Sequence, residues 1–237
     1  MTFGRQWKVK ISECPQRVRR TDSETIRMQS VQDNSGLKVI LTVPWLYDFF
    51  QNLTGAKICR AWLAKNIWNL KGGEKVVDMG CGPGVILEYL PDNIEYWGFD
   101  ISENYIKAAC KKFPHRGTFL IGTARNFQND SRLNRADLVI CNGLLHHLND
   151  DEALEVLELS KKIMKSNGRL VCFEPTFLAH QTWFSRWITS KDRGRCVRSE
   201  REWKDLVNKV FKSYSTNVVT GLVRLPYIHI VIECYAV

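Results

Sequence analysis

The chain has 237 residues and a mass of 27.5 kDa, a length typical of one large domain. Hydrophobic residues make up 44% and charged residues 25%, which is ordinary globular usage and excludes a disordered chain or a fibre. Lysine and arginine outnumber aspartate and glutamate by 34 to 25, so the net charge of +9 favours attraction of anionic partners.

Residues 1–36 are polar and charged without a sustained period, and we expect them to form a basic extension before a domain over 37–237. Two helices should follow, one from Pro44 and one over 56–70. The expected strands are 75–79, 96–100, 118–121, 136–141 and 169–174, and the helices among them are 85–90, 103–112 and 151–165. A helix over 200–210 and a hairpin of strands over 213–219 and 228–235 close the chain. Strands that alternate with helices predict an α/β fold, a parallel sheet covered on both faces with ligands at the carboxyl ends of its strands.

The cysteines and the N-terminal residues indicate the compartment. The eight cysteines include no C-x-x-C pair, which favours reduced thiols over a zinc site or a disulfide framework. The first ten residues lack an apolar core, and charges and a proline interrupt the longest apolar run. We therefore expect a cytoplasmic protein that does not bind a membrane. The oligomeric state is not indicated.

A glycine-rich turn, GCGPG at 80–84, leaves the strand at 75–79 and enters a helix. Glycine allows a tight turn and close approach to a ligand because it has no Cβ. The third glycine of a dinucleotide fingerprint falls on Val85, and Pro83 removes a donor that a pyrophosphate would need. Asp78 adds a negative charge that suits an ammonium or sulfonium group. A positively charged nucleoside is therefore favoured over a dinucleotide.

Asp100 ends the next strand, twenty residues after Gly80. A carboxylate at this place can accept hydrogen bonds from both hydroxyls of a ribose. Alone it could equally cap the following helix, but its spacing from the glycine turn favours ribose binding.

Together these segments resemble the class I S-adenosylmethionine-dependent methyltransferases. The matching sequences are VVDMGCGPG at 76–84, WGFDIS at 97–102, DLVICNGLLHHLND at 137–150 and NGRLVCFEP at 167–175. The resemblance implies a Rossmann-like sheet of seven strands whose last strand is antiparallel. It also implies S-adenosylmethionine as cofactor, S-adenosylhomocysteine as product, and a small-molecule acceptor of the kind methylated by bacterial saccharide and secondary-metabolite enzymes.

The residues expected to bind the cofactor lie at the ends of the first four strands, with one in the helix before them. They are Tyr47, Asp78, Gly80, Cys81, Gly82, Gly84, Asp100, Ile101, Thr123, Ala124 and Asn142. The chain departs from many relatives after the third strand, where an aspartate would bind the adenine amino group. Thr123 or Asn126 could take its place, and Tyr47 could equally be a plain core aromatic.

His146, His147 and Glu174 are the candidate catalytic residues, because they follow the fourth and fifth strands where the acceptor should lie. A histidine can take a hydroxyl or amine proton near neutral pH. The alternatives are that one histidine packs against the cofactor while the other orients the next helix, and that Glu174 makes only structural hydrogen bonds. No metal site is predicted, because adjacent histidines project in different directions.

A segment over about 175–199 lies where relatives insert a substrate cap, and it mixes aromatic and basic side chains. The candidate acceptor-binding residues are Trp183, Arg193, Arg195 and Tyr227. Arginines can hold a phosphate or carboxylate, so the acceptor is expected to be anionic. The positive charge leaves RNA methylation as an alternative, although the segment after the fourth strand lacks the N/D-P-P-Y/F sequence of amino-base methylators. A nonenzymatic cofactor-binding protein is the third hypothesis.

Overall fold

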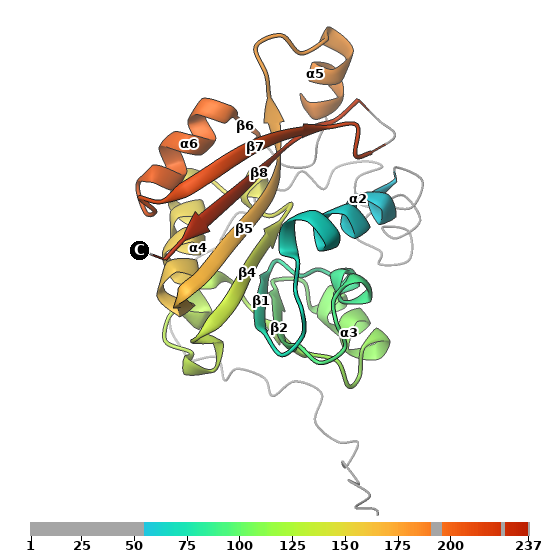
Figure 1. The fold of residues 1–237 in the computed structure, drawn as a ribbon, viewed down its shortest axis with the longest axis vertical. Helices are drawn as coiled ribbons and strands as arrows, with labels where there is room; N and C mark the ends of the chain where they lie inside the picture. Colours follow the sequence, from blue (N-terminus) through green and yellow to red (C-terminus); the bar gives the residue numbers. More distant parts are fainter. Residues whose placement is uncertain (1–54, 191–195, 224–225, 237) are drawn as a thin grey trace, which may run out of the picture.

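The computed structural model describes residues 55–190, 196–223 and 226–236 (Figure 1). The helix expected from Pro44, the extension over 1–36 and the predicted site residues Tyr47, Arg193 and Arg195 lie outside these described residues.

The sheet has the strand order β3-β2-β1-β4-β5-β8-β7. Its strands are β1 (Lys75–Met79), β2 (Glu95–Asp100), β3 (Thr118–Ile121), β4 (Ala136–Asn142), β5 (Met164–Phe177), β7 (Tyr214–Thr220) and β8 (Ile228–Tyr235). A two-residue strand β6 (Arg198–Ser199) pairs with the end of β5 off this path. The pairs from β3 to β5 are parallel, while β8 runs antiparallel to both β5 and β7. This confirms the expected α/β fold, with seven strands on the main path and an antiparallel last strand.

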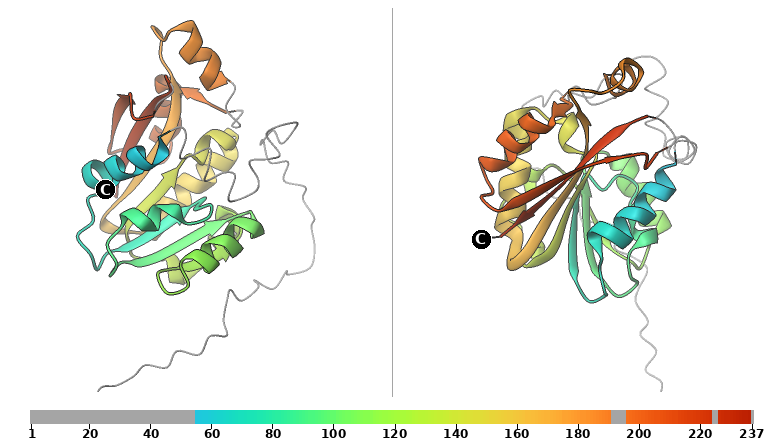
Figure 2. Two further views of the ribbon diagram at one scale, coloured as in Figure 1. Left: turned by 90° about the vertical axis from the view of Figure 1, so that its right-hand side faces the viewer. Right: turned by 45° about the horizontal axis from the view of Figure 1, so that its top comes forward.

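Two helical layers cover the sheet, as Figure 2 shows. On one face lie α4 (Asp150–Ile163) and α6 (Glu200–Asn208); on the other lie α2 (Ala56–Leu63) and α3 (Glu103–Lys112). Helix α2 continues as a π-helical turn η2 (Ala64–Trp68). The remaining helical elements are η3 (Val85–Tyr89), η4 (Ala124–Phe127), η5 (Ser131–Leu133), η6 (Leu145–His147) and α5 (Trp183–Ser190).

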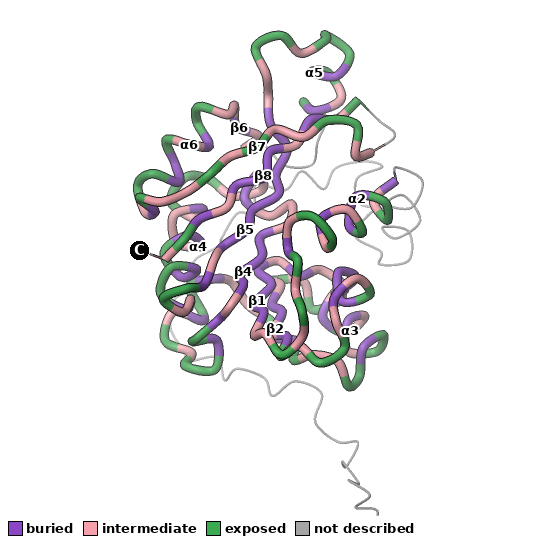
Figure 3. Tube along the Cα trace, viewed as in Figure 1, coloured by how far each residue is buried: buried purple, intermediate pink, exposed green. Residues whose placement is uncertain are grey.

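Strand β1 shows why both faces are covered. Val76 packs with the side chains of α2 and α3, whereas Val77 and Met79 pack with those of α4 and α6. Successive side chains of a strand point to opposite faces, so an apolar strand buries itself only between two layers. The buried residues concentrate in the centre of the sheet, as Figure 3 shows.

The boundary between α4 and β5 differs from the expectation. Helix α4 ends at Ile163 rather than at residue 165, and β5 begins at once with Met164, which pairs with Ala136. A register shift then brings Arg169 opposite Leu138. The sequence Asn167-Gly168 lies within this irregular start of the strand.

No helix among residues 55–190, 196–223 and 226–236 is both long enough and apolar enough to cross a membrane.

Candidate active site

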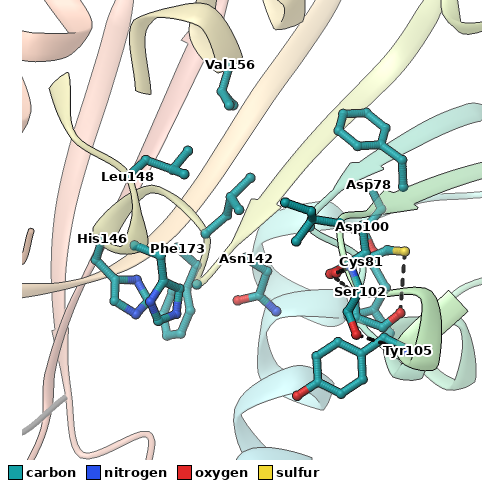
Figure 4. Close-up of a pocket in the computed structure, with 18 of the residues that line it drawn as sticks. Asp78, Cys81, Asp100, Ser102, Tyr105, Asn142, His146, Leu148, Val156 and Phe173 are labelled. Carbon is teal, nitrogen blue, oxygen red and sulfur yellow. Dashed lines mark hydrogen bonds between the residues drawn. The ribbon is translucent and has the colours of Figure 1, made fainter. Parts of the chain in front are cut away.

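The carboxyl ends of β1, β2, β4 and β5 open into one cavity of about 560 Å³. Figure 4 shows its two sides, with Asp78, Cys81 and Asp100 on one and His146 and Phe173 on the other, and Asn142 between them. This volume is in the range of small-molecule and cofactor sites.

The glycine turn after β1 forms the floor on the acidic side. Gly82 lines the cavity with a φ of +53°, and a Cβ built there would have no atom within 4 Å. Its backbone therefore faces open space that a ligand can fill. Gly84, with a φ of +71°, does not line the cavity, and a Cβ built there would lie 2.9 Å from the Phe119 ring. Its role is close packing of the turn rather than ligand contact.

Asp78 is the last residue but one of β1, and it lines the cavity although only 2% of its surface is exposed. The Tyr96 hydroxyl donates to its Oδ2 at 2.6 Å. Burial raises the pKa of the Asp78 carboxyl to about 7; the hydrogen bond from Tyr96 acts in the opposite direction, and nearby Asp100 raises the pKa further. A cationic ligand would stabilise the ionised form of a carboxylate held in this way.

Asp100 ends β2, and backbone groups fix its carboxylate. Ser102 N donates to Oδ1 at 2.7 Å and Gly82 N to Oδ2 at 3.0 Å. Burial raises its pKa, and these two donors oppose that shift. Each carboxylate oxygen can accept a second hydrogen bond, so Asp100 retains acceptor capacity for two hydroxyls. The same interactions join the ends of β1 and β2 into one rigid unit.

The segment after β3 brings Thr123 and Ala124 to the cavity, and Ile101 lines it with 62% exposure. Asn126 does not line it; its Oδ1 accepts from the backbone N and the Oγ1 of Thr123. This local capping occupies Asn126, which leaves Thr123 as the better placed of the two candidates for adenine contact.

The histidines lie on the short helix η6, directly after β4. Both His146 and His147 line the cavity, and their rings are 4.0 Å apart. Glu174 is fully buried and does not line the cavity, but its Oε2 lies 2.6 Å from Nδ1 of His146. The structure brings these three residues together, with the two histidines facing the cavity and Glu174 behind them.

Other cavity residues were not singled out from the sequence, among them Arg60, Tyr105, Phe173, Pro175 and Val223. The period of a strand could have indicated two of them, because Phe173 and Pro175 flank Glu174 and point to the opposite face. The ring of Phe173 stacks on His229 at 4.4 Å with 14° between the planes, and Tyr227 lies 5.1 Å from His229. These rings give the histidine side of the cavity an aromatic wall.

The cap segment contributes less than expected. Trp183 on α5 is 78% exposed and does not line the cavity, whereas Tyr227 does. Arg198 at the end of the segment is buried and binds Asp150 and backbone carbonyls. Asp150 is thereby paired, and no three side chains of the described ranges come together as a metal site.

A sequence profile described as a methyltransferase domain matches residues 52–210, two thirds of the chain. The chain belongs to this methyltransferase domain family. It is a class I S-adenosylmethionine-dependent methyltransferase by family and fold, with S-adenosylmethionine as its cofactor. No curated protein sequence matches the chain significantly.

Solved methyltransferase structures share the fold. An S-adenosylmethionine-dependent methyltransferase from Archaeoglobus fulgidus is 19% identical, with a TM-score of 0.63 over 79% of this chain and 99% of that one. The plantazolicin methyltransferase BamL, in complex with a triazolic desmethylPZN analog and S-adenosylhomocysteine, is 15% identical, with a TM-score of 0.60 over 86% of this chain and 92% of that one. The pyocyanin biosynthetic protein PhzM is 16% identical, with a TM-score of 0.59 over 76% of this chain. This chain spans only 55% of the length of PhzM.

The methyltransferase cofactor fits the acidic side of the cavity. Gly82 offers space that a Cβ would fill, Asp78 offers a buried carboxylate for a positive group, and Asp100 retains acceptor capacity for hydroxyls. Bound there, S-adenosylmethionine supplies a methyl group on a positively charged sulfur.

Proposed function

We propose that the protein transfers the methyl group of S-adenosylmethionine by direct displacement to an oxygen or nitrogen atom of a small-molecule acceptor. This proposal rests on one observation: a single cavity has two carboxylates suited to the cofactor on one side and a pair of histidines on the other. The nucleophilic atom of an acceptor bound beside the histidines would face the methyl group of a cofactor bound at Asp78 and Asp100.

Alignment of the two reactants is the main contribution that we assign to the chain. Orientation alone can supply about 7 to 11 kcal/mol of the barrier. A general base adds about 10²- to 10⁴-fold, or about 3 to 5 kcal/mol. His146 and His147 line the cavity and are the candidate bases, while Glu174 lies behind them.

The acceptor would lie against the wall of Phe173, Tyr227 and His229, which favours a molecule with a flat apolar part. Its anionic character remains a prediction that rests on Arg193 and Arg195, outside the described residues. If substitution of both arginines with alanine leaves the KM of the acceptor unchanged, the acceptor need not be anionic.

The test supplies the purified protein with methyl-labelled S-adenosylmethionine and a cell extract, and separates the labelled products by size and by ribonuclease sensitivity. We expect label in the small-molecule fraction, from which mass spectrometry identifies the acceptor. Label that ribonuclease releases would support the RNA alternative instead. The H146Q and H147Q variants, each checked for S-adenosylhomocysteine binding, then show which histidine the transfer needs.

A further inference from the structure

We infer that Glu174 and Arg198 are positioning residues that hold His146 from opposite ends of helix η6, with a protonated Nδ1 and with Nε2 as the basic nitrogen. This inference rests on the proposed function and specifies its base. Neither residue touches the cavity, so each acts through His146.

Glu174 binds the beginning of the turn. Its Oε1 accepts from Leu144 N at 3.0 Å and from Leu145 N at 2.8 Å, and its Oε2 accepts from His146 N at 3.3 Å. The first N–H groups of a helical turn have no partner within the turn, and a carboxylate is their preferred acceptor. A fully buried carboxylate in turn needs such donors. These hydrogen bonds therefore hold the Glu174 side chain and the η6 turn in a fixed position relative to each other.

The fourth interaction of Glu174 determines the proton on the imidazole ring. Nδ1 of His146 lies 2.6 Å from Oε2. An ionised carboxylate can only accept, so Nδ1 carries the hydrogen and donates it. In a neutral imidazole the lone pair then belongs to Nε2. His146 lines the cavity, so this tautomer makes it a proton acceptor there.

Arg198 binds the other end of the turn. Its Nη1 donates to Leu145 O at 3.1 Å and its Nη2 to Leu148 O at 3.0 Å. The same guanidinium contacts Oδ1 of Asp150 at 2.7 Å and lies over the Trp203 ring at 4.9 Å. A cation at the carbonyl end complements a carboxylate at the amide end.

The strand that carries Arg198 adds a further contact. Cys196 N donates to His146 O at 3.0 Å, and Arg198 pairs with Thr176 of β5. Glu174 lies two residues before Thr176 on β5. The backbone around His146 is thus held between β5 and the segment over 196–198.

The proton step balances with these groups. As the acceptor's oxygen or nitrogen forms its bond to the methyl carbon, the carbon–sulfur bond breaks and its electron pair stays on sulfur. The acceptor's O–H or N–H proton passes to Nε2 of His146. The imidazolium that results is stabilised by the Glu174 carboxylate at Nδ1.

Nitrogen-15 labelling of the histidines tests the tautomer without an acceptor. The chain has five histidines, and the H146Q variant assigns the His146 signals in the full-length protein saturated with S-adenosylhomocysteine. We expect a protonated Nδ1 and an unprotonated Nε2. A protonated Nε2 with an unprotonated Nδ1 in the wild-type protein would overturn the inference, even if labelled methyl transfer succeeds.

The E174Q variant replaces one carboxylate oxygen with an NH₂ group that must donate. We expect the proton of His146 to move to Nε2 and kcat to fall by about 100-fold or more, with S-adenosylhomocysteine affinity and the KM of the acceptor little changed. Unchanged tautomer and kcat in a folded E174Q protein would refute the role of Glu174.

The R198K variant keeps the charge but cannot reach both carbonyls and Asp150 at once. We expect kcat to fall by about tenfold or more while the tautomer is retained. The matched control is R169K, since Arg169 likewise binds two carbonyls, those of Ile67 and Trp68, and the carboxylate of Glu233. Equal kcat losses in R198K and R169K would mean that Arg198 acts only on stability and would remove it from the proposal.

Discussion

The hydroxyl of Tyr96 on β2 donates a 2.6 Å hydrogen bond to Oδ2 of Asp78 on the neighbouring strand β1, and both side chains are buried. Burial and the nearby Asp78 hold the pKa of Tyr96 well above its usual range, so the hydroxyl stays a donor. Tyr96 thereby stabilises the charged form of Asp78 from behind the cavity.

The Y96F variant removes this donor. We expect its affinity for S-adenosylhomocysteine at pH 7 to fall by about tenfold, because a hydrogen bond to a charged group contributes about 1.5 to 3 kcal/mol. Isothermal titration calorimetry measures the change, with Y235F on exposed Tyr235 as the control. Equal affinity in Y96F and wild type would show that Asp78 does not need the hydroxyl.

The pKa of about 7 for Asp78 predicts pH-dependent cofactor binding. In the proposed binding mode the ligand's ammonium pairs with the ionised carboxyl, so affinity for S-adenosylhomocysteine should rise between pH 5.5 and 7.5 by up to about tenfold per unit. Titrations across this range measure it. D78N should bind more weakly and without this slope; a slope that persists in D78N would assign it to Asp100, whose pKa burial also raises.

The raised pKa of Asp78 also makes the free energy of unfolding depend on pH. This free energy should fall as the pH rises, whereas the affinity for the ligand should increase. The folded-state pKa of Asp78 lies above the ordinary value of 3.8, so the folded protein binds a proton that the unfolded chain releases. This stabilisation is full below about pH 4 and is lost as the pH rises through 7. In the ligand-free protein, urea unfolding should therefore show a pH-dependent decline that D78N reduces.

Two glycines of the same turn should respond differently to alanine. Both adopt a positive φ, which costs a side-chain-bearing residue about 1 to 2 kcal/mol. In G84A the new Cβ also meets Phe119, so we expect the larger loss of stability. In G82A the Cβ enters the cavity, so the larger loss should be in S-adenosylhomocysteine affinity. Urea unfolding and calorimetry on both variants separate the effects, and the reverse order would contradict the assignment of Gly82 to the cofactor.

The N-terminal caps of α4 and α6 provide a matched pair. Asn149 caps α4 in a capping box with Glu152, and Ser199 caps α6 with Glu202. N149A and S199A should each lower the free energy of unfolding by about 1 kcal/mol. Labelled methyl transfer should persist in both, because Glu174 and Arg198 bind η6 through side-chain contacts that neither cap residue makes. A loss of transfer in N149A as large as in E174Q would show that the α4 cap also positions His146.

Tyr227 and Trp183 were both predicted to bind the acceptor, but only Tyr227 lines the cavity. We expect Y227A to raise the KM of the acceptor by about tenfold through the loss of ring contact. W183A should leave KM and kcat unchanged. Steady-state kinetics with the identified acceptor decides between them, and a raised KM in W183A would mean that α5 closes over the acceptor during the reaction.

The cofactor side of the cavity could be predicted because its signals are local. The turn at 80–84 and the acidic strand ends at Asp78 and Asp100 lie within 23 consecutive residues, and parallel strands bring their ends together. Spacing and residue type were therefore sufficient for most of these residues.

The contacts that hold the helical turn of the histidines could not be predicted, because they join distant parts of the chain. Glu174 lies 28 residues from His146, and Arg198 lies 53 residues from Leu145. The partners of Arg198 are backbone carbonyls and the carboxylate of Asp150, and no side-chain pattern in the sequence reveals these contacts.

The buried face of helix α5 is not the face that its apolar residues would predict. Its aromatic residues Trp183, Phe184 and Trp187 are exposed, while Ser185 and Thr189 are buried. The Ser185 hydroxyl donates to Pro226 O and accepts from Gln181, so polar contacts set the orientation of the helix. An apolar stripe predicts the buried face only where apolar packing is the stronger interaction.

The two sides of the cavity come from separate stretches of the chain. The carboxylates and the glycine turn lie before residue 125, and the histidines, the aromatic wall and the positioning residues lie after residue 140. The residues proposed for the acceptor can therefore be varied at sequence positions separate from those proposed for the cofactor. The two stretches meet at Asn142, between the two sides of the cavity.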